Sequence, residues 1–471
     1  MSVEMVQEVD VETVQEVEDA GGERFTDMAN ATRIAKEASE RAAHVAETKD
    51  RWHLYDGVKL VEEQRTAMIP FVKNAARRLY EEAHLAALKG MEERAELLKG
   101  GGDRLESRDG CFAALDLAKA EPSLRVKMAD LDAHPLWLNT PTATIDLETG
   151  EVWTPRFDDY LTKVTRATYD PRATCPRWLA FLAQVIPSPE VRAFMQRTVG
   201  YALTDLTTEQ CMWFLYGLGR NGKSTFINAV RYMLGDYAAS TKASTLMVKA
   251  HGDEKRNDIA VLRGARLVSV TETEDGQQMA ESLIKEITGQ DPVTARRMYA
   301  EFFTFTPTFK ILLAANHKPG IRGQDLAIWR RIKLVPFTET IPLDQVDKHL
   351  PAVLEAEASG ILNWAIEGFR AWQRDGLRPP QEVDAATEQY RIESDMLREF
   401  FEDCLIIGPS REASAREVFK AYQHWAEANG VNRPLTQQGL GRLLTARGYQ
   451  PTRYGKGRER GWAGFSINGR A

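Results

Sequence analysis

The spacing of apolar and polar positions divides the chain into segments with different expected structure. From residue 212 to residue 336, short continuous apolar runs alternate with helical patterns; these runs are 212–216, 266–270, 309–315 and 332–336. Strands that alternate with helices predict a mostly parallel α/β sheet. Before this region, residues 176–206 predict two short helices, which the "PSP" at 187–189 separates.

The flanking segments have weaker patterns. Residues 1–24 alternate acids with small apolar residues and predict a disordered tail. Residues 25–174 predict a mainly helical N-terminal domain, with a strand-like stretch at 51–61 and a hairpin near 134–155. A long helical pattern at 71–98 is expected to break at "KGGGD", residues 99–103. A helical connector is expected at 346–393.

Length and composition favour a multidomain globular protein. The chain has 471 residues, 43% apolar and 27% charged, which suggests two to four domains. No apolar run approaches the ~20 residues that cross a bilayer, and the acidic N-terminus lacks the order of a signal peptide. We therefore expect no membrane partner and a cytoplasmic location. The four scattered cysteines form no CxxC pair, which disfavours a zinc ribbon or a disulfide framework.

Charge is distributed unevenly along the chain. The net charge is −7, but residues 1–24 hold eight acids and one arginine, whereas residues 411–471 hold eleven Lys or Arg against four Glu. This asymmetry is more informative than the total, and it permits a nucleic-acid partner at the C-terminal end.

The stretch "GLGRNGKS" follows the first apolar run and precedes the helical pattern "TFINAVRYML". It fits G-x-x-x-x-G-K-[ST], in which backbone N–H groups and a helix N-terminus hold phosphates. Lys223 would reach the β- and γ-phosphates and Ser224 would ligate Mg²⁺. The nucleotide-binding residues predicted in this way are Gly217, Leu218, Gly219, Arg220, Asn221, Gly222, Lys223, Ser224 and Thr225.

Polar groups follow two further strands. The strand at 266–270 is followed by "TETED", where Glu272 and Glu274 are candidates for holding Mg²⁺ and activating water. The strand at 309–315 is followed by Asn316, which could sense the γ-phosphate. A solvated acidic turn and a turn Asn before Pro319 are the ordinary alternatives.

Arg330 and Arg331 precede the fourth strand. Paired arginines usually cap a surface. An arginine at this place could instead reach a neighbouring subunit's nucleotide as a finger, which contributes roughly 10³–10⁵ in rate.

These motifs together resemble those of the superfamily 3 helicases. The stretches "RLVSVTETEDG", "KEITGQDPVTARRMY", "TFKILLAANHKPGIRGQDLAIWRRIKLVPF" and, upstream, "IDLETGEV" are most similar to the phage and plasmid primase–helicase family that includes the poxvirus replicative nucleoside triphosphatase. The resemblance covers roughly 135–340. It implies an AAA+-like P-loop ATPase core, placed at 175–345, a hexameric ring, and ATP-driven translocation along single-stranded DNA.

Individual residues match the motifs of that family. Lys223 and Ser224 match the phosphate and magnesium positions, and Asn316 matches the sensor asparagine. Arg331 is the best match to the arginine finger, with Arg330 as the second choice. Many relatives carry two adjacent acids after the second strand, whereas here Thr271 precedes Glu272. Glu272 is then the expected catalytic and magnesium-binding carboxylate and Glu274 an auxiliary, and their division of labour stays open.

Two regions are candidates for DNA contact. Arg296 and Arg297 lie in a segment that projects into the central channel of similar helicases, where basic residues contact phosphates. A solvated hairpin or an intersubunit salt bridge is the alternative, and Tyr299 fits core packing better than base stacking. Residues 394–471 predict two helices and a basic hairpin, and they resemble a winged helix. The residues expected to contact DNA there are Arg442, Arg453, Lys456, Arg458 and Arg460, unless the hairpin is merely a solvated basic surface.

The sequence thus predicts an ATP-dependent replicative DNA helicase of a phage, prophage or plasmid, acting in the bacterial host cell. Because the N-terminal region lacks a primase constellation, a separate primase or polymerase is an expected partner. The main alternative is an ATP-switched replication initiator or mobile-element regulator without sustained unwinding. A small-molecule kinase would not need the basic tail or the arrangement of Asn316 and the arginines.

Overall fold

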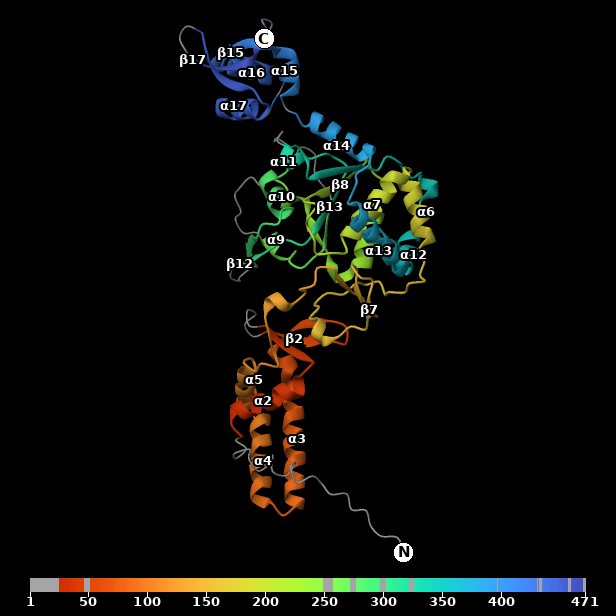
Figure 1. Cartoon of the computed structure of the whole chain (residues 1–471), viewed down its shortest axis with the longest axis vertical. Coiled ribbons are helices and arrows are strands. Elements are labelled where there is room, and N and C mark those ends of the chain that lie inside the picture. Colours follow the sequence, from red (N-terminus) through yellow and green to blue (C-terminus); the bar gives the residue numbers. More distant parts are fainter. Residues whose placement is uncertain are drawn as a thin grey trace. The chain divides into compact units, whose positions relative to one another are not determined.

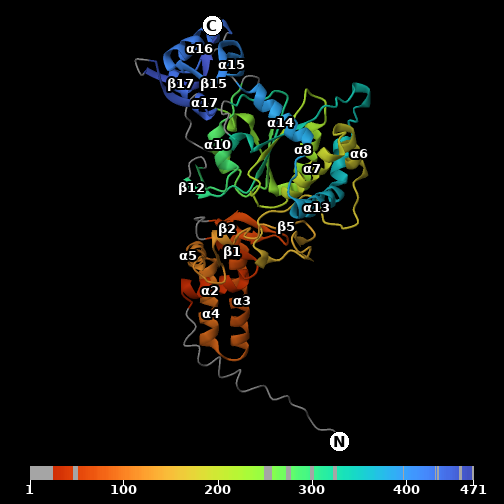
Figure 2. The same ribbon diagram turned by 45° about the horizontal axis from the view of Figure 1, so that its top comes forward.

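The computed structural model describes residues 25–45, 51–248, 257–271, 277–296, 302–321, 326–395, 397–429, 431, 434–455 and 459–468. The acidic segment at 1–24 lies outside them. The chain forms two compact units, one comprising residues 1–134 with 154–163 and the other 135–153 with 164–471 (Figures 1 and 2). The chain crosses between the units after residues 134, 153 and 163. The expected domain bounds stay a prediction.

The first unit combines helices with a small sheet. Its helices are α2 (Asp27–Ala38), α3 (Ile69–Leu88), α4 (Glu92–Glu106) and α5 (Arg108–Ala118). Its sheet has the order β3-β2-β1-β4, formed by β1 (Ala42–Val45), β2 (Arg51–Tyr55), β3 (Leu60–Gln64) and β4 (Arg125–Val126). The strand-like pattern at 51–61 is therefore a hairpin of β2 and β3. An alanine-rich core joins the helices.

The expectation of a helix break at 99–103 is wrong. Helix α4 continues through all three glycines, and the chain turns instead near Gly90, whose φ is +73°. Gly101 and Gly102 lie close to aromatic rings, since a Cβ would stand 2.4 Å from Phe25 and 2.6 Å from Tyr80. The glycines allow close packing of this helix, which local propensity does not reveal.

A parallel sheet organises the second unit. In the described part of the chain its strands are β8 (Met212–Tyr216), β9 (Ala238–Lys242), β10 (Leu267–Thr271), β13 (Lys310–Ala315) and β14 (Ile332–Pro336). Their order is β14-β8-β13-β10-β9, and every neighbouring pair is parallel. The prediction of a mostly parallel α/β sheet is confirmed. Strand β9 was not predicted, because its sequence "AASTK" contains no large apolar residue.

Strand residues alternate between two apolar layers. Trp213 and Leu215 pack with one set of helices, and Met212 and Phe214 pack on the other face. The first set consists of α6 (Pro176–Val185), α7 (Pro189–Tyr201), α8 (Lys223–Leu234), α12 (Leu350–Ala356) and α13 (Ala358–Asp375). The second face carries α9 (Asn257–Ala260), α10 (Glu281–Ile287), α11 (Leu326–Trp329) and the hairpin of β11 (Val293–Arg296) and β12 (Phe302–Phe305).

The expected connector at 346–393 is packed into this unit. Helices α7 and α13 cross closely, because a Cβ on Gly200 would lie 2.0 Å from the backbone of Phe369 and one on Gly368 would lie 2.1 Å from the carbonyl of Gln196. Helix α14 (Gln381–Glu393) lies against edge strand β14, where Leu334 N donates to Thr387 Oγ1 at 3.0 Å. The core therefore extends well beyond residue 345.

Two smaller sheets complete the second unit. The hairpin expected near 134–155 is the sheet of β5 (Trp137–Asn139), β6 (Thr144–Asp146) and β7 (Val152–Trp153). The C-terminal segment contains α15 (Arg398–Cys404), β15 (Leu405–Ser414), α16 (Ala415–Ala428), α17 (Gln437–Ala446), β16 (Gln450–Tyr454) and β17 (Glu459–Ile467). The two expected helices and the hairpin are present, and β15 adds a strand that was not predicted. The identity of the C-terminal segment as a DNA-binding winged helix stays a prediction.

Candidate nucleotide-binding site

The glycine-rich loop joins β8 to α8 at the carboxyl edge of the parallel sheet. Gly219, Arg220 and Gly222 have positive φ values of +103°, +47° and +80°, so the chain turns sharply at three of the loop's residues. Such turns point successive N–H groups toward one side, where they can hold an anion. Helix α8 begins at Lys223 without a side-chain cap, which leaves N–H groups of its first turn available to a ligand.

The loop is held firmly at its base. A Cβ on Gly217 would lie 2.1 Å from Asn221 Nδ2 and 2.3 Å from the carbonyl oxygen of Phe337. Asn221 Nδ2 itself donates to that oxygen at 3.1 Å. The tip differs from the base, since Leu218 is 85% exposed and the Ser224 side chain is also exposed. The loop thus offers a rigid backbone cradle with a hydroxyl at its rim.

Lys223 and Asn316 meet at the centre of the site. The buried Lys223 Nζ donates to Gly217 O at 2.7 Å, to Asn221 Oδ1 at 2.9 Å and to Asn316 Oδ1 at 3.1 Å. Burial lowers the pKa of this ammonium group. The contact arises because β8 and β13 are parallel neighbours, with Tyr216 opposite Ala315. Residues 93 positions apart in the sequence thereby share one polar cluster.

The predicted acids follow the next strand of the same sheet. Thr271, the last residue of β10, pairs with Ala314 of β13. Glu272 and Glu274 come directly after it in the chain but lie outside the described residues. Their roles stay predictions.

The two candidate finger residues lie at the opposite edge. Arg331 is 8% exposed, and its Nη1 donates to Ala327 O at 2.6 Å. Its carbonyl accepts from Met212 N at 2.7 Å, which places it at the amino end of β8. Arg330 is exposed, and its Nη2 donates to Gln210 Oε1 at 3.4 Å. The structure brings neither arginine to the glycine-rich loop of its own chain.

The candidate DNA contacts are only partly described. Arg296 lies on β11 opposite Phe302 of β12, and its guanidinium stands 5.3 Å from the centre of that ring. Phe302 is 63% exposed. Phe302 was not among the residues predicted to contact DNA, although the aromatic stretch "EFFTF" at 301–305 was visible in the sequence. Arg297 and Tyr299 lie outside the described residues.

Two basic side chains face each other in the C-terminal hairpin. Arg453 and Arg460 are exposed and occupy directly opposed positions on β16 and β17. Because directly opposed residues of an antiparallel pair lie on the same face of a sheet, both arginines belong to one exposed surface. Arg442 is exposed on α17, whereas Lys456 and Arg458 lie outside the described residues.

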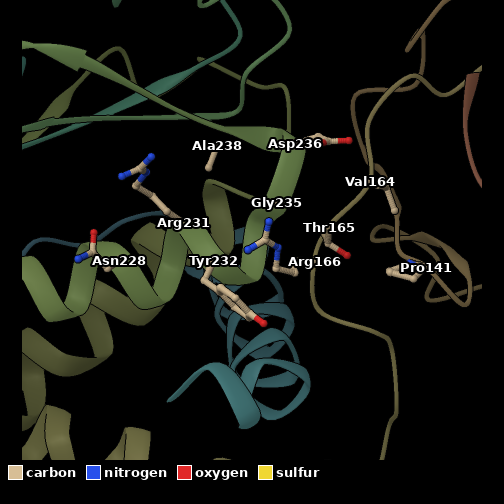
Figure 3. Close-up of a pocket in the computed structure, with 10 residues that line it drawn as sticks. All are labelled: Pro141, Val164, Thr165, Arg166, Asn228, Arg231, Tyr232, Gly235, Asp236 and Ala238. Carbon is tan, nitrogen blue, oxygen red and sulfur yellow. The ribbon is translucent and has the colours of Figure 1, made fainter. Parts of the chain in front are cut away.

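A hollow of about 560 Å³ lies at the other end of α8 from the loop (Figure 3). Arg231 and Tyr232 line it from α8, and Arg166 lies with its guanidinium 4.9 Å from the Tyr232 ring centre. None of the residues of the glycine-rich loop line this hollow. It is therefore separate from the candidate nucleotide site.

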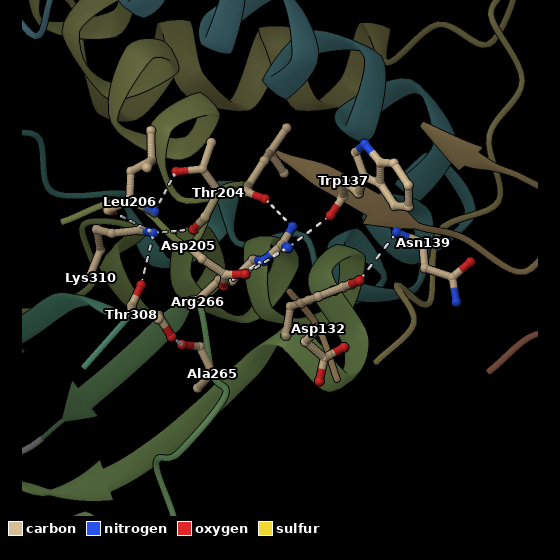
Figure 4. Close-up of polar contacts among 12 residues, drawn as sticks. Asp132, Trp137, Asn139, Thr204, Asp205, Leu206, Ala265, Arg266, Thr308 and Lys310 are labelled. Atoms are coloured by element: carbon tan, nitrogen blue, oxygen red, sulfur yellow. Dashed lines mark hydrogen bonds and ion pairs between the residues drawn. The ribbon is translucent and has the colours of Figure 1, made fainter. Parts of the chain in front are cut away.

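A buried polar cluster lies at the amino edge of the sheet (Figure 4). Arg266 forms two hydrogen bonds to Asp205, at 2.9 and 3.1 Å. The Lys310 ammonium group donates to the carbonyls of Thr204, Leu206 and Thr308. Burial lowers the pKa of Lys310 to about 7. This cluster was not predicted from the sequence, because charged residues at the start of a strand are normally exposed to solvent.

The described residues show neither a helix long and apolar enough to cross a membrane nor a group of three or more His, Cys, Asp or Glu arranged to hold a metal ion.

The fold and the loop define the chain as a parallel α/β protein with a candidate phosphate site at the carboxyl edge of its sheet. Residues 31–187 match a family described as "D5 N terminal like". Residues 215–331 match one described as a family of unknown function, DUF5906. The first match includes residues of both compact units.

Several proteins of large DNA viruses are similar to this chain. "Putative helicase L207/L206" of Acanthamoeba polyphaga mimivirus is 24% identical over 64% of the chain and 34% of that protein. "Putative helicase 022R" of Frog virus 3 (isolate Goorha) is 27% identical over 61% and 31%. "Putative primase C962R" of African swine fever virus (isolate Warthog/Namibia/Wart80/1980) is 24% identical over 64% and 34%. The chain spans about a third of the length of these relatives.

One solved structure supports the fold. The A form apo structure of the NrS-1 C-terminal region has a TM-score of 0.51 at 8% identity, and covers 93% of this chain and 99% of that one. At this identity the likeness concerns the fold alone. The viral proteins to which the chain is similar are thus named as putative helicases and a putative primase.

Proposed function

We propose that this chain is an ATP-dependent replicative DNA helicase that forms a ring, with a hexamer as the expected assembly. The observation that carries the proposal is the contact between Lys223 and Asn316 across neighbouring parallel strands, beside a glycine-rich loop. A lysine that both holds a phosphate and touches a polar group on the next strand can couple nucleotide state to the rest of the sheet. The names of the viral relatives support the same class of activity.

The site fits ATP with Mg²⁺. The positive-φ backbone at Gly219 and Gly222 and the uncapped first turn of α8 offer donors to phosphate oxygens. Thr225, in that first turn, adds a backbone N–H. Lys223 would exchange its bonds to Gly217 O and Asn221 Oδ1 for bonds to β- and γ-phosphate oxygens. ATP supplies the phosphoanhydride whose cleavage releases the energy for movement.

Magnesium and the attacking water would meet the remaining polar groups. The exposed Ser224 hydroxyl would ligate Mg²⁺, and Glu272 would complete the metal site and activate water. Glu274 would assist Glu272, and Asn316 would orient the water or sense the γ-phosphate. These roles place the reacting groups along the carboxyl ends of adjacent strands.

We propose Arg330, in preference to Arg331, as the arginine finger. A finger must leave its own subunit and reach a neighbour's phosphate. Arg331 is buried and bonded within its own chain, whereas Arg330 is exposed. Mixing Arg330→Ala with Lys223→Ala subunits should restore part of the ATP turnover that either variant alone lacks, because each can complete a pocket with a neighbour's intact group.

DNA would contact the β11–β12 hairpin and the C-terminal segment. Arg296 and Arg297 would neutralise phosphates, and the opposed Arg453 and Arg460 would share one. Arg442, Lys456 and Arg458 would extend that basic surface. We further propose a phage, prophage or plasmid origin, action in the bacterial cytoplasm, and priming by a separate primase or polymerase.

The test combines ATP hydrolysis, with and without single-stranded DNA, and unwinding of a fork. We expect DNA to stimulate hydrolysis and the fork to be unwound, and Lys223→Ala to abolish both. The rival function, an initiator switched by ATP, gains support from the basic C-terminal hairpin. It predicts nucleotide-dependent DNA binding without unwinding. Absence of ATP binding by the intact chain would refute both.

A further inference from the structure

The loop that follows Asn316 is anchored from two sides. On one side, Gly320 N donates to Gln277 O at 2.8 Å, and Gly320 O accepts from Met279 N at 2.9 Å. On the other side, Lys318 and Pro319 contact helix α14. The position of Asn316 opposite Lys223 therefore depends on residues remote from the glycine-rich loop.

Lys318 connects α14 to the start of the glycine-rich loop. Its Nζ donates to Glu393 Oε2 at 2.7 Å. The same ammonium group lies 4.8 Å from the ring centre of Tyr216, the last residue before Gly217, and 5.7 Å from that of Tyr390. A cation over the face of an aromatic ring is attracted by the ring's negative face. One cation thus contacts both the residue before the loop and the end of α14.

Tyr390 provides a buried attachment at the same place. Its side chain is 1% exposed, and its hydroxyl donates to the carbonyl of Pro319. The ring packs against Phe214 of β8 and against Trp329 at centroid distances of 5.8 and 5.2 Å. Breaking this hydrogen bond would leave a buried polar group unsatisfied, which is unfavourable. The Pro319 carbonyl is therefore strongly held to α14.

We propose that Tyr390 and Glu393 of α14 are positioning residues for ATP hydrolysis, because they hold the Lys318–Pro319 segment and thereby fix Asn316 against Lys223. The inference rests on the proposed ATPase function. It assigns to α14 a part in the chemical step, although α14 contributes no residue to the glycine-rich loop. It also gives a route by which movement of α14 would change turnover.

The test compares three substitutions on the same helix. Tyr390→Phe removes only the hydroxyl, and Glu393→Gln removes the charge that faces Lys318. Thr387→Val is the matched control, because it removes the hydrogen bond from Leu334 N to α14 but touches nothing in residues 316–320. For each variant one measures kcat and KM for Mg-ATP, the affinity for a fluorescent ATP analogue, and the thermal midpoint.

Tyr390→Phe and Glu393→Gln should lower kcat about tenfold while the affinity for the analogue stays within about twofold, since a small misplacement of a catalytic group can cost up to ~10²-fold. Thr387→Val should lower the thermal midpoint yet keep kcat within about twofold. A kcat unchanged in both test variants, or lowered equally by Thr387→Val, overturns the inference while leaving the proposed function intact. If the unsubstituted chain neither binds nor hydrolyses ATP, the proposed function fails and the inference with it.

Discussion

Gly222, the residue before α8, gives the sharpest quantitative prediction. Its φ is +80°, and a Cβ there would lie 2.6 Å from Val185 Cγ1 and 2.9 Å from Phe181 Cε2. Both neighbours are buried and cannot move into solvent. Replacement by alanine adds the left-handed backbone cost of about 1–2 kcal/mol to an overpacking cost of about 1–3 kcal/mol. Gly222→Ala should therefore lower the free energy of unfolding by about 2–5 kcal/mol.

A double-mutant cycle with Val185→Ala separates the two costs. Removing the Val185 methyl groups relieves the contact at 2.6 Å but leaves that with Phe181, so the destabilisation by Gly222→Ala should shrink by a part of the overpacking cost of about 1–3 kcal/mol in that background. Urea unfolding followed by circular dichroism provides the free energies. Gly219→Ala is the control, since its φ is +103° but a Cβ there meets nothing within 4 Å. Additive effects of Gly222→Ala and Val185→Ala would refute the steric argument.

Three further predictions follow from buried or closely packed groups. Lys310 has a folded-state pKa of about 7, against 10.5 for the ordinary side chain, so the unfolded chain binds more protons between these pH values. The free energy of unfolding should therefore rise with pH in this range, by up to about 1.4 kcal/mol per pH unit. Lys310→Met should flatten this rise in urea titrations from pH 6 to 9, and an unchanged slope would contradict the prediction. In α4, Gly102→Ala should lower the thermal midpoint, because its Cβ would meet Tyr80 at 2.6 Å. Gly100→Ala, whose Cβ would meet nothing within 4 Å, should instead stabilise the helix by about 1 kcal/mol. Equal shifts of the thermal midpoint in the two variants would argue against close packing at Gly102. Arg330→Ala should abolish ATP turnover without loss of nucleotide affinity, and full activity of this variant would exclude it as the finger.

The sequence predicted most of the sheet, because continuous apolar runs mark buried parallel strands clearly. Four strands appear within one residue of their expected bounds, and only the small, polar β9 escaped. The contact between Lys223 and Asn316 was also foreseeable, since residues at the carboxyl ends of neighbouring parallel strands meet at one edge. The local sequence pattern was sufficient to predict the strands, and the Lys223–Asn316 contact then follows from the geometry of a parallel sheet.

The sequence failed where tertiary contacts reverse a local preference. Three consecutive glycines usually break a helix, but at 100–102 they allow α4 to approach two aromatic rings. Arg266 directly precedes β10 and Lys310 begins β13, where charged residues are normally solvated, yet both are buried against backbone carbonyls. The burial of Arg331 likewise depends on α11, which the pattern did not predict.

The close crossing of α7 and α13 determines how this protein can be shortened. A fragment ending at residue 345 would keep the whole parallel sheet and its loop but would lose the helix that covers Gly200. The apolar side chains that α13 shields would then face water, and exposed patches of that kind promote aggregation. Because Val383 and Tyr390 of α14 also lie in the two apolar layers, a soluble minimal fragment should retain the chain through Glu393.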